Sequence, residues 1–106
     1  MQGYQITFFT QQGRKHGHTA LCDWLLGLAK DCGLHGATIV GAAKGFGHTG
    51  QMHSAGFFDL ADQPQLVVMS ATAEQAETLL ERIRSEDLQL FYLKCPAEFG
   101  LLGAGT

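Results

Sequence analysis

The sequence predicts one small α+β domain in which an antiparallel sheet carries two helices on one face. Two segments, residues 21–32 and 76–83, repeat apolar side chains at the spacing of one helix face. Several other short segments are rich in β-branched and aromatic residues, which are typical of strands. With 106 residues, the chain is long enough for one compact domain and too short for two.

The first half of the chain predicts a strand, a helix and a second strand. Residues 4–10 form a run of aromatic and β-branched side chains that favours a strand. Thr19 is expected to cap the first helix, and Gly33 is expected to end it in the left-handed conformation that glycine adopts easily. Residues 37–43 are the second expected strand.

The second half of the chain predicts the same succession of elements. A third main strand is expected at residues 66–71, and Thr72 with Gln75 fits a capping box at the start of the second helix. Residues 88–93 complete the set as a last strand. The whole order predicts a ferredoxin-like βαββαβ sandwich, with an extra short strand in the loop between the second and third main strands.

The domain is expected to span residues 1–95, followed by a glycine-rich tail at residues 96–106. The chain has no secretory signal and no apolar run of the roughly 18 residues that would cross a bilayer, so a cytoplasmic protein is expected. Its cysteines, Cys22, Cys32 and Cys95, are then expected to be buried reduced thiols. A net charge of −3 argues against a nucleic-acid-binding surface.

The expected strands are apolar on both of their faces. In the first strand Ile6 and Phe8 point to one side and Phe9 to the other, and the later strands show the same poor alternation. Apolar patches of this extent are uncommon on monomers, so a second copy of the sheet is the simplest cover for the side without helices. Surface strands that are merely somewhat apolar are the alternative.

Four features in the middle of the chain resemble the PII-like signalling proteins, in particular their uncharacterised branch of a domain of unknown function. These features are Gly36–Val40, Gly45-Phe46-Gly47, His53 and the turn Asp62-Gln63-Pro64. The resemblance implies a homotrimer that binds a small effector between its subunits. It also implies signalling through the loop after the second strand, here residues 44–64, with a membrane transporter or channel as a partner.

One turn departs from the pattern of PII proteins. Those proteins hold phosphates with a glycine- and lysine-rich turn between the second helix and the last strand, whereas Ser85-Glu86-Asp87 is short and acidic here. This turn is expected to repel phosphate, so nucleotide binding in the usual manner of PII proteins is not expected.

The candidate ligand-binding residues fall in two glycine-bearing loops. Arg14 and Lys15 immediately precede the first helix, whose free N–H groups and dipole favour an anion. The others lie in the loop that the resemblance marks as the signalling loop, and they are Lys44, Gly45, Gly47, His48 and His53. A solvated polar loop without a ligand is the alternative for both segments.

A metal site is the second hypothesis, because His16 and His18 precede Cys22 by short spacings and His48 and His53 flank a glycine-rich loop. The alternative function is therefore a divalent-metal-binding or metal-tolerance protein of the same fold. No nucleophile with a base, no pair of catalytic carboxylates and no cofactor motif is found in the sequence, so neither an enzyme nor a bound cofactor is expected.

Overall fold

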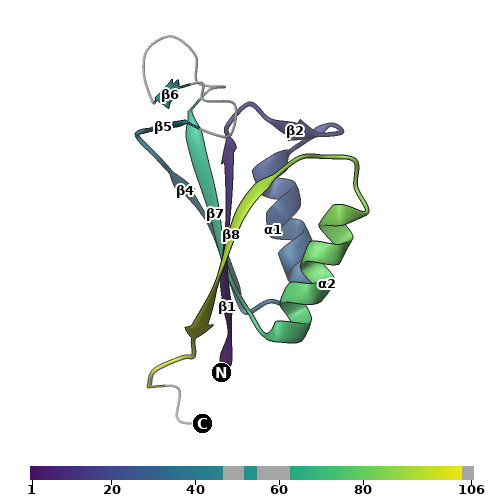
Figure 1. Ribbon diagram of the computed structural model, residues 1–106, viewed down its shortest axis with the longest axis vertical. Helices are drawn as coiled ribbons and strands as arrows, with labels where there is room; N and C mark the ends of the chain where they lie inside the picture. Colours follow the sequence, from purple (N-terminus) through teal and green to yellow (C-terminus); the bar gives the residue numbers. More distant parts are fainter. Residues whose placement is uncertain (47–51, 55–62, 104–106) are drawn as a thin grey trace.

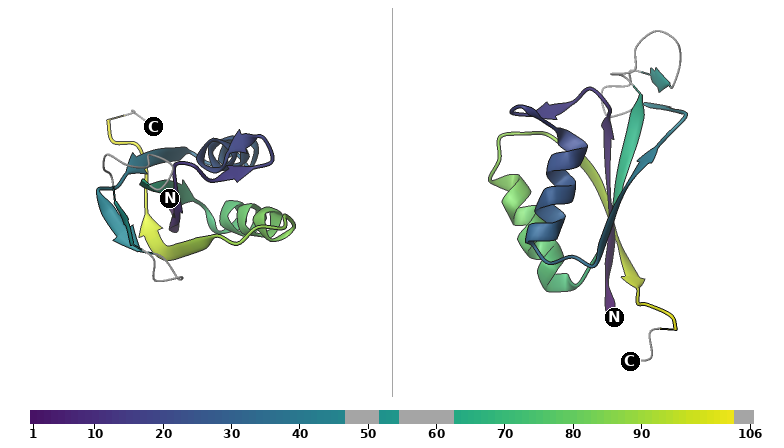
Figure 2. Two further views of the ribbon diagram at one scale, coloured as in Figure 1. Left: turned by 90° about the horizontal axis from the view of Figure 1, so that it is seen from above. Right: turned by 180° about the vertical axis from the view of Figure 1, so that it is seen from behind.

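The computed structural model describes residues 1–46, 52–54 and 63–103, and it confirms the predicted sandwich. The four long strands are β1 (Gln2–Gln11), β4 (Gly36–Gly41), β7 (Pro64–Ala71) and β8 (Phe91–Glu98). They form an antiparallel sheet in the order β4-β7-β1-β8. The helices α1 (Leu21–Asp31) and α2 (Ala73–Arg84) lie side by side on one face of this sheet (Figures 1 and 2).

Two short hairpins are added to this plan. The strands β2 (Lys15–His16) and β3 (Thr19–Ala20) form a hairpin before α1, which the sequence did not predict. The strands β5 (Lys44–Phe46) and β6 (Met52–Ser54) form the other hairpin between β4 and β7, where one extra strand was expected.

The core lies between the sheet and the helices. The strands β1 and β7 direct alternate residues into it, and Ile6, Phe8, Val67 and Met69 are each at most 1% exposed. The helices contribute the apolar residues that recur at helical spacing, which include Leu21, Leu25, Leu28, Ala76, Leu79 and Ile83. Because burying a large apolar side chain stabilises a fold by roughly 1.5–3 kcal/mol, these residues fix both helices on the sheet.

The two helices begin in different ways. In α2, the Thr72 hydroxyl accepts a hydrogen bond from the Gln75 N–H at 3.2 Å, and the Gln75 side chain accepts one from the Thr72 N–H at 2.9 Å, which confirms the capping box. The expected Thr19 cap of α1 is wrong, because Thr19 belongs to β3 and Ala20 precedes the helix without a side-chain cap. Gly33 has a φ of 78° just beyond α1, as expected for a left-handed helix end.

The last strand is shifted toward the C-terminus from its expected position at residues 88–93. The strand β8 begins at Phe91 and continues past Cys95, the expected domain boundary, to Glu98. The reason is its pairing with the long strand β1, which runs from Phe9 opposite Phe91 to Gln2 opposite Glu98. The two leucines that were expected in this strand, Leu88 and Leu90, instead pack against the core.

The face of the sheet without helices bears uncharged side chains in three cross-strand rows. At the end where β1 stops, the row across the sheet is entirely apolar: Phe91, Phe9, Leu66 and Val40. The next row is mixed (Leu93, Thr7, Val68 and Thr38), and the third is polar or small (Cys95, Gln5, Ser70 and Gly36). Phe91 is 59% exposed and Leu93 is 50% exposed, so nothing in the described chain covers this apolar end.

The three cysteines differ in burial. Cys22 is buried, Cys32 is half-buried and Cys95 is exposed, so the expectation of three buried thiols is wrong for Cys95. Cys95 is exposed because it lies on the uncovered face of an edge strand. Within the part of the chain that the structure describes, no helix is long and apolar enough to span a membrane.

Candidate functional site

The candidate site lies at one end of the molecule, which we call the loop end. The strand β1 stops there, α1 begins there, and the β2–β3 hairpin and the turn from α2 to β8 lie beside each other (Figure 1). The β5–β6 hairpin is attached to the same end. The antiparallel topology therefore brings together segments that are far apart in the sequence.

The β2–β3 hairpin is a tight turn built on glycine. Gly17 has a φ of 64° between the paired ends His16 and Thr19, a conformation that a glycine adopts without steric cost. The hairpin is closed against the helix by a hydrogen bond from the Leu21 N–H to the Arg14 carbonyl at 2.9 Å. Lys15 and the turn around Gly17 are thereby held out in solvent, next to the start of α1.

The same hairpin is fastened to the turn between α2 and β8. His16 Nε2 lies 2.8 Å from Glu86 Oε1, and the His16 ring packs on Trp24 of α1 with 4.4 Å between ring centroids. The Arg14 guanidinium donates a hydrogen bond to the Gln89 carbonyl. We call this set of contacts the clasp. It joins a hairpin near the N-terminus to a turn some 70 residues later in the chain.

The clasp changes the roles expected for the residues before α1. Arg14 was expected to hold a ligand, but its guanidinium is engaged by a backbone carbonyl of the same chain. Lys15 is exposed and no described contact involves its amine, whereas Arg14 uses one of its five N–H donors in the contact to Gln89 and keeps its charge. Asp23 occupies the first turn of α1, where a carboxylate already complements the helix dipole and opposes a second anion.

The acidic turn after α2, residues 85–87, makes contacts that its sequence did not predict. The Glu86 carboxylate is paired with His16, and Arg14 contacts the backbone a few residues further on. That this turn repels phosphate stays a prediction. The contacts of Glu86, Gln89 and Trp24 could not be predicted, because neither periodicity nor local spacing connects these positions.

The β5–β6 hairpin contains the other candidate residues. Lys44 pairs with Ser54, and Gly45 pairs with His53. Gly47 and His48 lie outside the residues that the structure describes. This hairpin lies on the side of the sheet away from the helices, whereas the β2–β3 hairpin lies on the helix side (Figure 2). Within one chain, the two groups of candidate residues therefore share an end of the molecule but not a side.

The structure does not bring together His16, His18 and Cys22 as a metal site. His16 contacts Glu86, and Cys22 points into the core, where its thiol donates a hydrogen bond to the Gln65 side chain at 3.1 Å. Burial raises the pKa of the Cys22 thiol and the nearby Asp23 raises it further, which disfavours the thiolate that a metal requires. Among the described residues, no group of three or more His, Cys, Asp and Glu side chains is placed to hold a metal ion.

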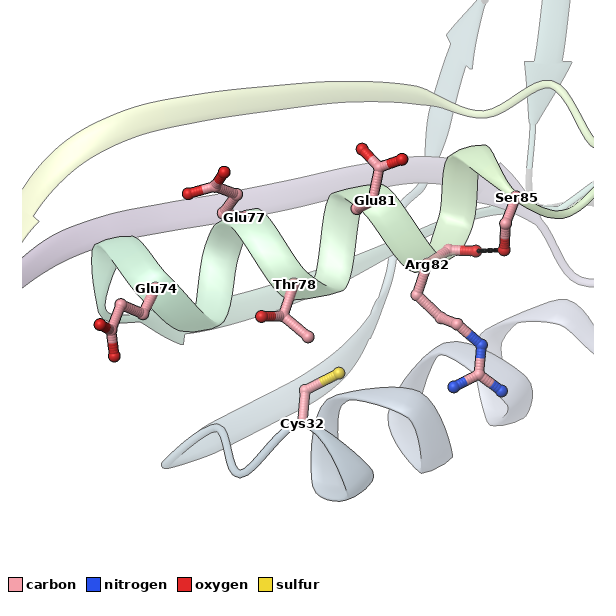
Figure 3. Close-up of a pocket in the computed structure, with 7 residues that line it drawn as sticks. All are labelled: Cys32, Glu74, Glu77, Thr78, Glu81, Arg82 and Ser85. Carbon is pink, nitrogen blue, oxygen red and sulfur yellow. Dashed lines mark hydrogen bonds between the residues drawn. The ribbon is translucent and has the colours of Figure 1, made fainter.

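A depression on the described surface lies away from the loop-end hairpins, between α2 and the end of α1. It is an open groove of about 700 Å³ (Figure 3). Its lining residues are Cys32, Glu74, Glu77, Thr78, Glu81, Arg82 and Ser85. Three carboxylates against one guanidinium make this groove unsuitable for an anionic ligand.

A second crevice, of about 130 Å³, lies between α2 and β8. It is lined mainly by apolar residues, including Phe8, Leu80 and Leu90, with Arg84 at its edge. This crevice belongs to the packing of α2 on the sheet rather than to the hairpins.

Comparison with known proteins gives a family and a fold. Residues 3–87 match the DUF190 family, described as Uncharacterized ACR. No curated protein matches the sequence.

Several solved structures share the fold. A putative PII-like signalling protein from Thermus thermophilus is 20% identical, with a TM-score of 0.67 over 92% of this chain and 88% of that one. CPII from Thiomonas intermedia K12 is described as a nitrogen regulatory PII-like protein, and that structure is bound to ADP, AMP and bicarbonate. CPII is 18% identical, with a TM-score of 0.65 over 94% of this chain and 97% of CPII. The chain therefore belongs to the DUF190 family and has the fold of the PII-like signalling proteins.

Proposed function

We propose that this chain is a cytoplasmic homotrimeric regulatory protein that binds a small anionic ligand or nucleotide between its subunits. It signals through residues 44–64, with a membrane transporter or channel as its target. Membership of DUF190 and the PII-like fold support the regulatory role. The ligands named for CPII, which are ADP, AMP and bicarbonate, supply the first candidates to test.

The observation that carries the proposal is the uncharged face of the sheet. None of the residues in its three cross-strand rows is charged, although 16% of the chain is charged. An exposed apolar surface of this kind marks an interaction site. A cyclic assembly buries the same surface in every copy at once, so a trimer whose three copies pack through this face would remove it from water.

The placement of the two hairpins supports a ligand between copies. The β5–β6 hairpin lies on the side that faces a neighbour in such an assembly, and the β2–β3 hairpin lies on the opposite side of its own sheet. A ligand at the loop end would then be contacted by the β5–β6 hairpin of one copy and by the helix-side hairpin of another. Lys15 on one copy and Lys44 on the next would supply the positive charge, with His53 as a further candidate contact.

The clasp assigns separate tasks to the residues before α1. Arg14 and His16 hold the β2–β3 hairpin on the turn after α2, and Lys15 extends from that fixed base into solvent. A fixed base reduces the conformational entropy that binding must overcome. The proposed ligand contact is therefore Lys15, while Arg14 positions it.

Light scattering and ligand titration test the two parts of the proposal separately. Light scattering at micromolar concentration should give a mass of three 11.4 kDa chains. Thermal unfolding in the presence of ADP, AMP, bicarbonate or Zn²⁺ should show a rise in Tm with at least one of the three anions, because a ligand that binds only the folded state stabilises it. A rise with Zn²⁺ alone would favour the metal-binding alternative.

Two variants make the ligand test specific. Lys15→Gln should weaken binding of the stabilising anion, because it removes an exposed cation and no described contact. Lys30→Gln changes another exposed lysine, in the last turn of α1; it is the matched control and should leave binding unchanged. Equal affinities of the wild type and the Lys15 variant would remove this residue from the site, and a monomeric wild type would overturn the trimer.

A further inference from the structure

The segment after β8 is anchored at the end of the sheet opposite the loop end. The Phe99 N–H donates to the Met1 carbonyl at 2.9 Å, and the N-terminal amine donates to the Phe99 carbonyl at 2.6 Å. The Phe99 ring packs on His35 with 6.0 Å between centroids. It also lies over Gly3, where an added Cβ would be 3.0 Å from the ring. Phe99 is therefore a fixed point rather than the start of a free tail.

Two leucines project from this fixed point into solvent. Leu101 is 83% exposed and Leu102 is 99% exposed, the two largest values among the exposed large apolar residues of the described chain. Figures 1 and 2 show the segment leaving the sheet on the side away from the helices. The leucines and the uncovered apolar row are therefore on the same side of the molecule.

The leucines cannot cover the apolar row of their own chain. Phe9, in that row, lies eight residues along β1 from Met1, or roughly 26 Å at about 3.3 Å per residue. Leu102 is three residues beyond Phe99 and reaches at most about 11 Å from it, even in a fully extended chain. The part of the face nearest the leucines holds Gly3 and Ala97 and then the row of Cys95, Gln5, Ser70 and Gly36, which together offer little apolar surface.

We infer that Leu101 and Leu102 of one copy pack on the apolar row of a second copy, formed by Phe91, Phe9, Leu66 and Val40. The inference rests on the proposed homotrimer and adds a residue-level contact to it. Each chain has one such pair of leucines and one such row, so a closed cyclic assembly matches every pair with a row.

The chemistry of both surfaces favours a second copy over another occupant. Neither the row nor the segment Gly100–Gly103 carries a charge, and the nearest charged residue before the leucines is Glu98. Within the three described rows, a basic peptide would find no carboxylate, and a bilayer surface would find no lysine or arginine side chain to attract anionic lipid headgroups.

A cross-linking experiment tests the contact directly. Leu101→p-benzoylphenylalanine places a photoreactive group at a site where side-chain replacement disturbs no packing within the chain. Irradiation of the full-length protein should give a covalent dimer on a denaturing gel, with cross-linked peptides from residues 5–11, 36–41, 65–71 or 91–95. The same group at the exposed Ala73 of α2 is the control and should give none.

A second measurement follows assembly itself. The double variant Leu101→Ser/Leu102→Ser should dissociate at a protein concentration at least about tenfold higher than the wild type, because each leucine loses apolar burial. Ala73→Ser should match the wild type. A trimeric wild type whose double variant dissociates at an unchanged concentration would overturn the inference, as would the absence of a covalent dimer or cross-links confined to the helices. A monomeric wild type would overturn the homotrimer as well.

Discussion

Phe91 offers the sharpest test of the proposed assembly, because its side chain lies on the uncovered face and is 59% exposed. A phenylalanine presents roughly 200 Å² of surface, so burial of the exposed part in a neighbouring copy removes about 120 Å² from water. At about 25 cal/mol per Å², this burial stabilises the assembly by about 3 kcal/mol per copy, or about a hundredfold in the dissociation constant. We expect Phe91→Ser to raise the dissociation constant of the trimer by about this factor.

The neighbouring residue on the same strand supplies the control. Tyr92 is 43% exposed, but it is paired with Phe8 and lies on the helix side, with 6.4 Å between the two ring centroids. Tyr92→Ser should therefore lower the stability of the chain toward urea while leaving the uncovered face intact.

The two variants are expected to give opposite results in two assays. Light scattering over a dilution series should show dissociation for Phe91→Ser, and urea unfolding measured below the dissociation concentration should show the larger loss for Tyr92→Ser. The reasoning would be refuted if a trimeric wild type and Phe91→Ser dissociated at the same concentration, because the exposed ring would then not lie at the interface.

Three further outcomes are expected. Thr72→Ala removes the helix cap and should lower the free energy of unfolding by about 1 kcal/mol in a urea titration; an unchanged value would show that the cap contributes nothing. His16→Ala should speed hydrogen exchange at the backbone amides of the turn after α2, whereas His18→Ala, at an exposed position, should not; equal exchange in both variants would contradict the clasp. At neutral pH a thiol reagent should modify Cys95 of the dissociated, folded chain rapidly and Cys22 only on unfolding, because Cys95 is exposed within one chain whereas burial raises the pKa of the Cys22 thiol and so lowers its thiolate fraction; rapid reaction of both thiols before unfolding would contradict this.

The sequence predicted the elements whose signals are local. The two helices depend on apolar residues repeated within one turn of each other, and the cap of α2 depends on Thr72 and Gln75, three positions apart. The cap expected at Thr19 was wrong, because the local sequence did not distinguish a helix cap from a hairpin. A threonine is compatible with both structures, and only the pairing of Thr19 with His16 decided for the hairpin.

The candidate site was predicted less completely than the fold. The loops that carry Arg14, Lys15, Lys44 and His53 were identified by their glycines and charges, and the topology places both at the loop end. Which cation is engaged within the chain could not be predicted, because the Gln89 carbonyl that Arg14 contacts is 75 residues away. The contribution of each candidate residue to ligand binding stays a prediction.

By itself, the sequence determined the βαββαβ order, the two amphipathic helices and the excess of apolar residues on the strands, since all of these are patterns within short windows. Only the tertiary structure decided the position of β8, the exposure of Cys95 and the joining of His16 to Glu86. These features follow from strand register and from contacts across the whole chain. The same register gathers Phe91, Phe9, Leu66 and Val40 from four strands into one uncovered row, which no single stretch of the sequence reveals.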